Sequence, residues 1–292
     1  MEKIRKNKKV IAVFLIPAVL IYLCFELIPV VMSVYFSFND WPGLQAVPLK
    51  FVGFKNYSNL FHNAVFLKSL QNVLIYVVVS VILQVPIGFG LGLLIHHFKK
   101  GQRFFKAAFF IPMILSVTAV ALLWNFIYFP TDKGILNSLL IKIGLGNYIQ
   151  QWLVNPKTSL ICLIVVSTWT SVGYYMIICL AGLTSIPDSV LEAGELDGAT
   201  GWKKIWNLYI PMLWEPLKMS TIMVITGVLK IFDTVYILTP TGGTSNCTIV
   251  PALLMYNEAY RYGHYGTGSA IATVIFVSVS YTHLRAHETR GN

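Results

Sequence analysis

Charged side chains are scarce in this sequence. Of its 292 residues only 12% are Asp, Glu, Lys or Arg, whereas 56% are hydrophobic, and the mean hydropathy is +0.67. An ordinary soluble domain contains about 25% charged and about 45–50% apolar residues. Because so little charge cannot cover a globular chain of this length, the composition excludes a soluble enzyme, a disordered chain and a coiled coil. A polytopic membrane protein remains.

Motifs that indicate chemistry are also missing. The four cysteines are far apart, form no CxxC and have no histidine at metal-ligand spacing. No G-x-x-x-x-G-K-[ST] phosphate loop occurs, so the chain cannot hydrolyse ATP by that chemistry. No Ser/His/Asp or Cys/His arrangement suits a catalyst, and His96-His97 is interpreted as an interfacial pair rather than a metal site. We therefore expect no catalytic residue, no metal and no cofactor in this chain.

Long apolar runs, by contrast, are abundant. A membrane span needs about 20 mostly apolar residues, and the sequence contains five such runs and a shorter sixth: Val10–Ser37, Leu70–Ile95, Ala107–Phe129, Ser159–Thr184, Met219–Leu238 and a run that begins near Gly266. The first run is too long for the apolar core of a signal peptide, and no A-x-A-like site follows it. The pattern predicts an all-α membrane protein with six transmembrane helices over residues 10–280.

The sixth run is short, and the sequence changes character after it. Only about 15 apolar residues follow Gly266, too few to cross about 30 Å of hydrocarbon. Residues 281–292 read YTHLRAHETRGN and resemble an adaptor-like tail of fragmentary predicted proteins. We interpret the sixth helix as truncated and the tail as foreign sequence, and we assign no function to His283, Arg285 or His287.

Small residues occur at helical spacing in the second run. Gly88 and Gly92 form a GxxxG there, but no strand precedes it, as a nucleotide-binding glycine loop would require. We interpret these glycines as a surface on which another helix packs closely.

Lysine and arginine are distributed unevenly between the two sides of the membrane. Alternate connecting segments, beginning with the N-terminus, carry fourteen of these residues, and the opposite set carries seven. In membrane proteins this excess marks the cytoplasmic side, so the net charge of +10 reports orientation rather than a nucleic-acid partner. The bias predicts a cytoplasmic basic N-terminus over residues 1–9 and a cytoplasmic connection over residues 186–212.

The connection Ile186–Met212 differs from a passive linker. Asp188 or Ser189 can cap a first short helix, and Asp197-Gly198 should end it, because glycine adopts the left-handed conformation found at helix ends. A second short helix should start at Thr200 and stop at Pro211. Its apolar face would consist of Trp202, Ile205, Trp206 and Tyr209. Asp197 should cap this second helix or contact a partner protein.

Two interpretations of this segment follow from the residues alone. Two short helices that meet at a glycine corner, with Glu192, Glu195 and Asp197 near the bend, suit docking to a partner protein. An amphipathic connector that lies on the lipid headgroups fits the same pattern.

A family resemblance favours docking. The segment closely resembles the EAA loop of ATP-binding-cassette (ABC) importer permeases, in which E-A-A, D-G-A and a later proline recur. The matching residues here are Glu192, Ala193, Gly194, Asp197, Gly198, Ala199 and Pro211. Gly194 replaces the usual alanine, which should loosen the first helix without abolishing the fit. Further landmarks resemble sugar-type permeases of the maltose, glycerol-phosphate and multiple-sugar group: Ser37–Trp41, Phe51–Tyr57, Gly134–Asn137, Leu180–Leu183, Phe232–Asp233 and Thr239–Gly243.

The resemblance implies a type I ABC importer permease in a bacterial cytoplasmic membrane. Its partners would be a second permease subunit in a heterodimer, two ATPase subunits that bind ATP and dock on the EAA loops, and an extracellular solute-binding protein. The alternative is an ion-coupled secondary transporter of a small polar solute, which would show internal repeats and broken helices but would leave the EAA-like loop unexplained. A membrane-embedded hydrolase would need His/Glu or Ser/Lys motifs that the runs lack.

Five residues are candidates for the substrate path. Lys230 and Asp233 are ionisable residues inside the fifth run, where insertion costs about 2.5–3.5 kcal/mol each. At i and i+3 they would share a helix face and neutralise each other, or Asp233 would face the path and bind sugar hydroxyls. Trp169, Tyr174 and Tyr175 offer flat faces for sugar rings, although core packing or interfacial anchoring is the more common role for any one aromatic side chain.

Overall fold

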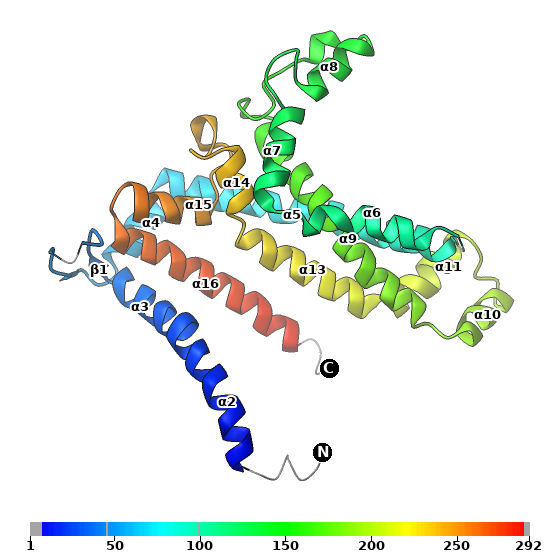
Figure 1. The fold of residues 1–292 in the computed structure, drawn as a ribbon, viewed down its shortest axis with the longest axis horizontal. Helices are drawn as coiled ribbons and strands as arrows, with labels where there is room; N and C mark the ends of the chain where they lie inside the picture. Colours follow the sequence, from blue (N-terminus) through cyan, green and yellow to red (C-terminus); the bar gives the residue numbers. More distant parts are fainter. Residues whose placement is uncertain (1–7, 45, 99, 289–292) are drawn as a thin grey trace. The chain divides into compact units, whose positions relative to one another are not determined.

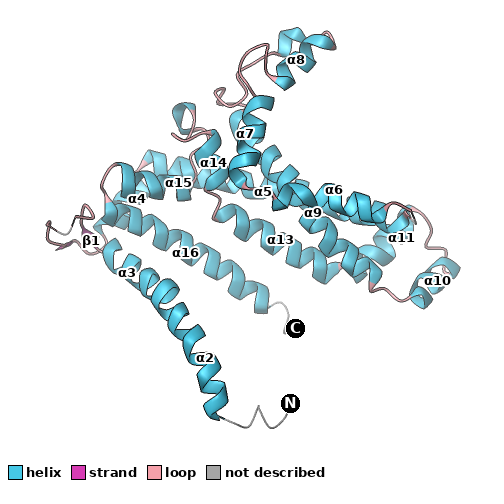
Figure 2. Cartoon of the chain, viewed as in Figure 1, coloured by secondary structure: helices cyan, strands magenta, loops and turns pink. Residues whose placement is uncertain are grey.

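The computed structural model describes the backbone of residues 8–44, 46–98 and 100–288, and the side chains of these residues between 12 and 282. This part of the chain is predominantly helical (Figures 1 and 2). The strands are β1 (Asn39–Asp40) and β2 (Lys50–Phe51), which pair antiparallel with Asn39 opposite Phe51. The chain divides into two compact units, Met1–Asn63 with Leu254–Phe276, and Ala64–Leu253 with Val277–Asn292.

The first unit begins with one long helix. Its segments α2 (Lys8–Tyr22), the π-helix η1 (Leu23–Leu27) and α3 (Ile28–Ser37) follow one another without interruption. The range Ala12–Ser37 is long and apolar enough to cross a membrane, which agrees with the predicted first span. No residue from 12 to 36 is buried within the chain.

Hydrogen bonds from side chains of residues 37–57 stabilise the C-terminal end of this helix. The Asn56 amide, on α4 (Lys55–His62), donates hydrogen bonds to the carbonyls of Ser37 at 2.8 Å and Asn39 at 3.0 Å. The Tyr57 and Ser37 hydroxyls lie 2.6 Å apart. The family-like stretch Phe51–Tyr57 therefore braces the end of the first helix, a role for which hydropathy gives no signal. The first unit also includes η5 (Asn257–Arg261), a second π-helix, and the start of α16 (Tyr265–Glu288).

The second unit is built on two long helices, α5 (Ala64–His97) and α9 (Ser159–Thr184). They pack along each other because Gly88 and Gly92 let the backbones approach: a Cβ at Gly92 would lie 3.2 Å from Cys179 Cβ. Both helices are long and apolar enough to cross a membrane, so the second and fourth predicted spans are confirmed. The interpretation of the glycines as a close-packing surface is also confirmed. The unit's other elements outside the 186–212 segment are α6 (Gln102–Ile114), α7 (Val117–Ile127), α8 (Ile135–Lys142), η2 (Gly146–Tyr148), α13 (Trp214–Leu229), α14 (Asp233–Leu238), η4 (Thr244–Asn246) and the first half of α15 (Pro251–Tyr256).

The predicted third span is not one helix. α6 and α7 meet at an angle of 98° across Leu115 and Ser116. Ser116 adopts an extended conformation and its hydroxyl accepts a hydrogen bond from the Ala119 backbone, so it is the N-cap of α7. A serine inside an apolar run was the available signal, and the prediction of a single helix missed it.

Around α8, one asparagine holds several loops together. Asn137 is fully buried, and its amide lies 3.3, 3.0 and 3.2 Å from the carbonyls of Phe129, Thr131 and Gln150. Its oxygen accepts a hydrogen bond of 2.8 Å from the Trp152 indole. The family-like stretch Gly134–Asn137 thus has a structural role.

Fewer helices than the six predicted are long and apolar enough to cross a membrane. Three of the described helices are long and apolar enough, or up to five if each bent pair counts as one span. α16 is not among them, although it continues to Glu288, beyond the predicted end of apolar sequence at Ser280. The prediction of a foreign tail falls partly on residues 289–292, outside the described part.

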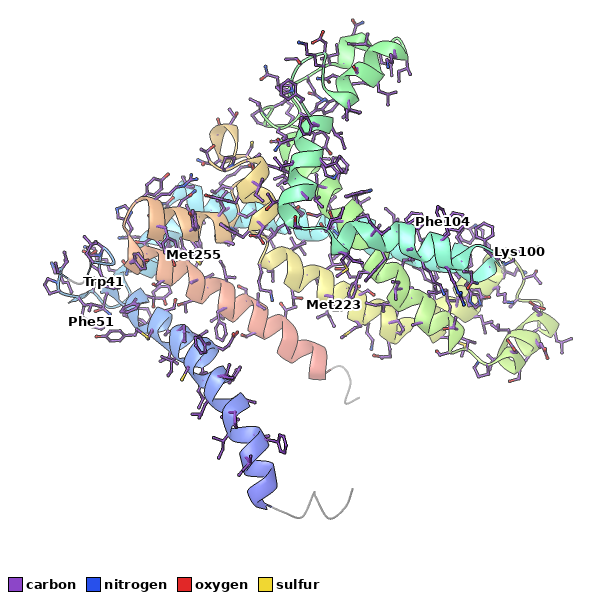
Figure 3. The ribbon with its side chains drawn as sticks, viewed as in Figure 1. Trp41, Phe51, Lys100, Phe104, Met223 and Met255 are labelled. Atoms are coloured by element: carbon purple, nitrogen blue, oxygen red, sulfur yellow. The ribbon has the colours of Figure 1, made fainter. Side chains whose placement is uncertain are left out.

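Apolar side chains cover the outer surfaces of the helices (Figure 3). Phe104 on α6 is 71% exposed and Phe14 on α2 is 79% exposed. A surface of this kind suits lipid, because lipid tails impose no penalty on exposed apolar side chains.

Candidate functional site

The Ile186–Met212 segment contains two short helical pieces between α9 and α13. The first is α10 (Asp188–Leu196), and the second runs through α11 (Trp202–Lys204), the π-helix η3 (Ile205–Tyr209) and α12 (Ile210–Met212). The predicted pair of short helices is therefore confirmed, but the second begins at Trp202 rather than at Thr200.

The end of α10 is a Schellman motif. Gly198 has φ +80°, its N–H bonds the Glu195 carbonyl at 3.0 Å, and the Ala199 N–H bonds the Gly194 carbonyl at 2.8 Å. These two hydrogen bonds satisfy carbonyls that a helix end leaves free. The predicted break at Asp197-Gly198 is confirmed, with Asp197 as the last half-helical residue.

A second glycine, Gly201, sets the entry into α11 and was not singled out from the sequence. It has φ +54° and ψ −123°, the conformation of the first central residue of a type II′ turn, which glycine dominates. No atom lies within 4 Å of the place where its Cβ would be, so backbone conformation alone requires glycine there. The turn signal was the Ala-Thr-Gly-Trp stretch itself.

Three expectations about the helix ends are wrong. The N-cap of α10 is Pro187, so neither Asp188 nor Ser189 caps it. No side chain caps α11, where Gly201 occupies the N-cap position, so Asp197 has no capping role there. Pro211 is not the last residue of the second helical piece, which continues for one residue to Met212. The chain bends by 72° after Met212 instead.

An apolar cluster holds the two ends of the segment together. Leu183, Ile186 and Leu213 are buried against one another. Val190 and Leu191 of α10 and Tyr209 of η3 pack on this cluster, together with Phe89, Leu93 and Leu217 of α5 and α13. The base of the segment is therefore part of the helical core.

An ion pair joins the two short helices. Lys204 Nζ lies 2.6 Å from Glu195 Oε1, and the Lys204 ammonium also lies 5.7 Å from the ring centre of Tyr209. The hydrogen bond that Lys204 donates to Glu195 is the main reason that the pKa of Lys204 is raised above its ordinary value. Because Glu195 is 57% exposed, we expect only a small contribution to stability from the pair.

The far end of the segment presents an apolar side chain to solvent. Leu196 is 90% exposed, between the exposed carboxylates of Glu192 and Asp197. Trp202 and Trp206 are 72% and 64% exposed. An exposed leucine beside acidic groups, outside the long apolar helices, is available for contact with a partner protein. Leu196 was not among the candidate residues identified from the sequence.

Replacing Gly194 with alanine should stabilise α10 by about 0.5–1 kcal/mol, because alanine loses less backbone entropy than glycine in a helix. The new methyl would lie 4.0 Å from Ala199 Cβ, where it would complete the apolar contact of the Schellman motif. It would also lie 3.3 Å from the tip of Leu208, whose flexible side chain would shift by a few tenths of an ångström. Hydrogen exchange of the α10 amides should slow accordingly. The matched control, Ala193→Gly at an exposed position of the same helix, should speed exchange; slower exchange in both variants would contradict the argument.

The aromatic path candidates lie in different surroundings on α9. Tyr175 is buried, and Tyr174 is half-buried with its hydroxyl 3.7 Å from the sulfur of Met223 on α13. Trp169 is 36% exposed and makes an edge-to-face contact with Trp124 at 5.8 Å. Tyr175 therefore belongs to the core, and Trp169 remains accessible.

Lys230 and Asp233 do not share a helix face, which corrects the sequence prediction. α13 ends at Leu229 with Lys230 as its C-cap, and α14 begins at Asp233. Both side chains are exposed, and the structure gives no ion pair between these two described residues. The break leaves both groups at helix ends. No group of three or more His, Cys, Asp or Glu within the described residues could hold a metal ion.

Comparison with known proteins gives a consistent set of similarities. Residues 84–286 match the family model described as "Binding-protein-dependent transport system inner membrane component". The chain is 36% identical over 277 residues to the probable ABC transporter permease protein YurN of Bacillus subtilis, with 94% of this chain and 93% of that protein covered. It is 33% identical over 268 residues to the lactose transport system permease protein LacF of Rhizobium radiobacter, with 91% and 88% covered.

A solved structure has the same fold. The crystal structure of a bacterial alginate ABC transporter, in complex with alginate pentasaccharide-bound periplasmic protein, contains a chain that matches with a TM-score of 0.83. The match covers 98% of this chain and 94% of that one at 21% identity.

Proposed function

Because this chain belongs to the family of binding-protein-dependent transport system inner membrane components, we propose that it forms part of the membrane pathway of an ATP-driven importer for a sugar or a related polar solute. The chain is a membrane-embedded ABC transporter permease, a transport subunit and not an enzyme. The alternative of an ion-coupled secondary transporter is set aside, since the family works with binding proteins.

The sugar class rests on the relatives. The names of several describe permeases for lactose, multiple sugars and arabinooligosaccharides, and each matches over nine-tenths or more of this chain. In this proposal Asp233, Lys230, Trp169 and Tyr174 are the candidates for contact with the solute. Tyr175 would act by packing beneath them, because its side chain is buried.

The coupling surface is the exposed end of the 186–212 segment. We assign docking of an ATP-binding subunit to Glu192, Leu196 and Asp197, while Gly198 and Gly201 set the angle between the two short helices. The observation that carries this assignment is Leu196, 90% exposed at the tip of a segment whose base is buried in the helical core. ATP itself would bind only to that partner subunit.

The assembly we propose contains a second permease subunit, two ATP-binding subunits and an extracellular solute-binding protein. The N-terminus and the 186–212 segment would lie in the cytoplasm, as the excess of lysine and arginine on that side indicates. The exposed carboxylates at the tip would then meet a complementary surface of the ATP-binding subunit.

Replacing Leu196 with serine tests the docking assignment. An apolar anchor at the centre of an interface is worth about 2 kcal/mol or more, so binding of the ATP-binding subunit should weaken about 30-fold. Co-purification and labelled-sugar uptake measure the loss, while expression of the permease should stay normal. The matched control is Leu145→Ser at another exposed leucine, which should bind the ATP-binding subunit as the unchanged protein does.

Accessibility of the same position checks the side of the membrane. A cysteine at position 196 should react with a membrane-impermeant maleimide only after cells are opened. Reaction of this cysteine in intact cells would refute the cytoplasmic location of the segment. In the binding experiment, normal binding of the ATP-binding subunit by Leu196→Ser would refute the docking role.

A further inference from the structure

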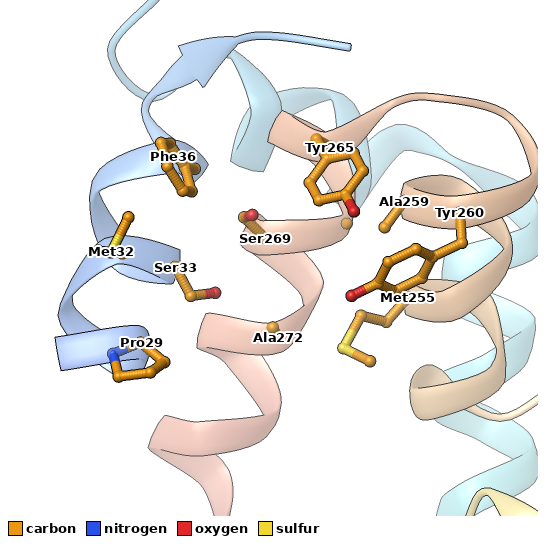
Figure 4. Close-up of a pocket in the computed structure, with 11 residues that line it drawn as sticks. Pro29, Met32, Ser33, Phe36, Met255, Ala259, Tyr260, Tyr265, Ser269 and Ala272 are labelled. Atoms are coloured by element: carbon orange, nitrogen blue, oxygen red, sulfur yellow. The ribbon is translucent and has the colours of Figure 1, made fainter. Parts of the chain in front are cut away.

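The first unit contains a cavity of about 300 Å³. It lies between α3, the η5 turn and the first turns of α16 (Figure 4). Small-molecule sites usually begin at about this volume, with a mainly apolar lining and a few polar groups that fix orientation. The lining here follows that composition.

Two serine hydroxyls open onto this cavity without a protein partner. Ser269 on α16 is 8% exposed, and Ser33 on α3 faces it across the cavity (Figure 4). Neither hydroxyl makes a hydrogen bond to another described residue, although Thr273, one turn further along α16, donates to the Ser269 carbonyl at 2.9 Å. Ser269 is thus a nearly buried residue whose hydroxyl faces the cavity and is available to a ligand there.

Aromatic rings form the rest of the wall. Tyr260 and Tyr265 pack edge to face with ring centres 5.4 Å apart, and Tyr265 does the same with Trp41 at 5.7 Å. The ring centre of Trp41 also lies 4.8 Å from that of Phe36, which lines the opposite side of the cavity. These contacts fix the rings, so the cavity offers preformed flat faces beside its two hydroxyls.

The backbone around the cavity is shaped for close approach. Ala259 and Tyr260 lie on the π-helix η5, an irregular turn that is frequent at functional sites. A Cβ at Gly268 would lie 2.8 Å from Ala259 Cβ, so glycine lets η5 and α16 touch below the cavity. The cavity is therefore held by packing rather than left by a loose loop.

The lining contains no Asp, Glu, Lys, Arg or His, so a charged ligand would find no partner there. We propose that this cavity binds one ring of a neutral saccharide, with Ser33, Ser269 and the Tyr260 hydroxyl bonded to its hydroxyls and the aromatic rings against its apolar face. The proposal rests on the proposed sugar-import function. With the N-terminus in the cytoplasm, the α3 end lies toward the outside, where the binding protein delivers its cargo.

Binding to the purified full chain in lipid nanodiscs tests the proposal, without ATPase or binding protein. Saturation-transfer NMR would use maltotriose, lactose and arabinotriose as neutral probes and trigalacturonate as the acidic one. At least one neutral probe should receive saturation and the acidic probe none. Ser269→Ala and Tyr260→Phe should each weaken that binding about fivefold through loss of one hydrogen bond, and Ala272→Phe, which fills the cavity, should abolish it.

Tyr262→Phe is the matched control, because Tyr262 is 60% exposed and does not line the cavity. It should bind the probe as the unchanged chain does. Saturation of no neutral probe, equal saturation by trigalacturonate, or unchanged binding in Ser269→Ala and Tyr260→Phe would each overturn the proposal. ATPase co-purification by the same variants separates the outcomes: if it is retained while no probe binds, the cavity proposal fails and the import function stands.

Discussion

Replacing Gly201 with alanine should disrupt coupling more than the same change at Gly198. Gly198 occupies the left-handed region, where an L-residue costs about 1 kcal/mol. Gly201, at φ +54° and ψ −123°, occupies a region that side chains avoid more strongly, at about 2–3 kcal/mol. Because α11 starts directly after Gly201, the strain should be relieved by a changed helix direction. We expect binding of the ATP-binding subunit to fall about 30- to 100-fold for Gly201→Ala and about fivefold for Gly198→Ala.

Gly146→Ala provides the reference for these variants. Gly146 has an ordinary backbone conformation and open space around its Cβ position, so alanine should be neutral there. Titration of the ATP-binding subunit onto the permease in nanodiscs gives the three affinities. An equal loss in all three variants, or a greater loss for Gly198→Ala than for Gly201→Ala, would show that backbone strain does not set the helix angle.

Replacing Asn137 with leucine should unfold the region around α8. The change removes an amide that binds three carbonyls and an oxygen that binds the Trp152 indole, and it leaves these partners without hydrogen bonds. Each unpaired buried group costs about 1–3 kcal/mol, so a loss of about 3 kcal/mol or more is expected. Thermal unfolding followed by tryptophan fluorescence measures it, since Trp152 is itself a partner.

Asn147→Leu is the matched change, at an exposed asparagine just after α8. It should alter the unfolding temperature little. If Asn137→Leu unfolds at the same temperature as Asn147→Leu, the hydrogen bonds seen at Asn137 do not hold the loops together.

The coupling segment was largely predictable because its signals are local. The two short helices and the break at Asp197-Gly198 follow from residue order, and the structure has both. The capping assignments failed for Asp188 and Ser189 because Pro187 is already in the extended conformation that an N-cap requires. The start at Trp202 depends on Gly201, whose turn type is decided by backbone angles that composition does not reveal.

The apolar runs were less informative about continuity. Hydropathy found the first, second and fourth spans but joined α6 to α7, because a serine cap inside an apolar run hardly lowers the average. It also joined α13 to α14, which placed Lys230 and Asp233 on a common face that does not exist. Hydropathy did not reveal the structural roles of Asn56 and Asn137, because the carbonyls that they bind are brought together by loop conformations that composition does not encode.

The buried contact of Leu183, Ile186 and Leu213 bears on how load would pass through the coupling segment. These residues hold the C-terminal end of α9 against the start of α13. The two ends of the segment therefore meet at one buried contact. Close-packed side chains are nearly incompressible, and a displacement at the tip cannot be absorbed by spreading the base. We therefore expect the segment to move as one rigid body about this contact, so that a force at Leu196 would turn the ends of α9 and α13 together.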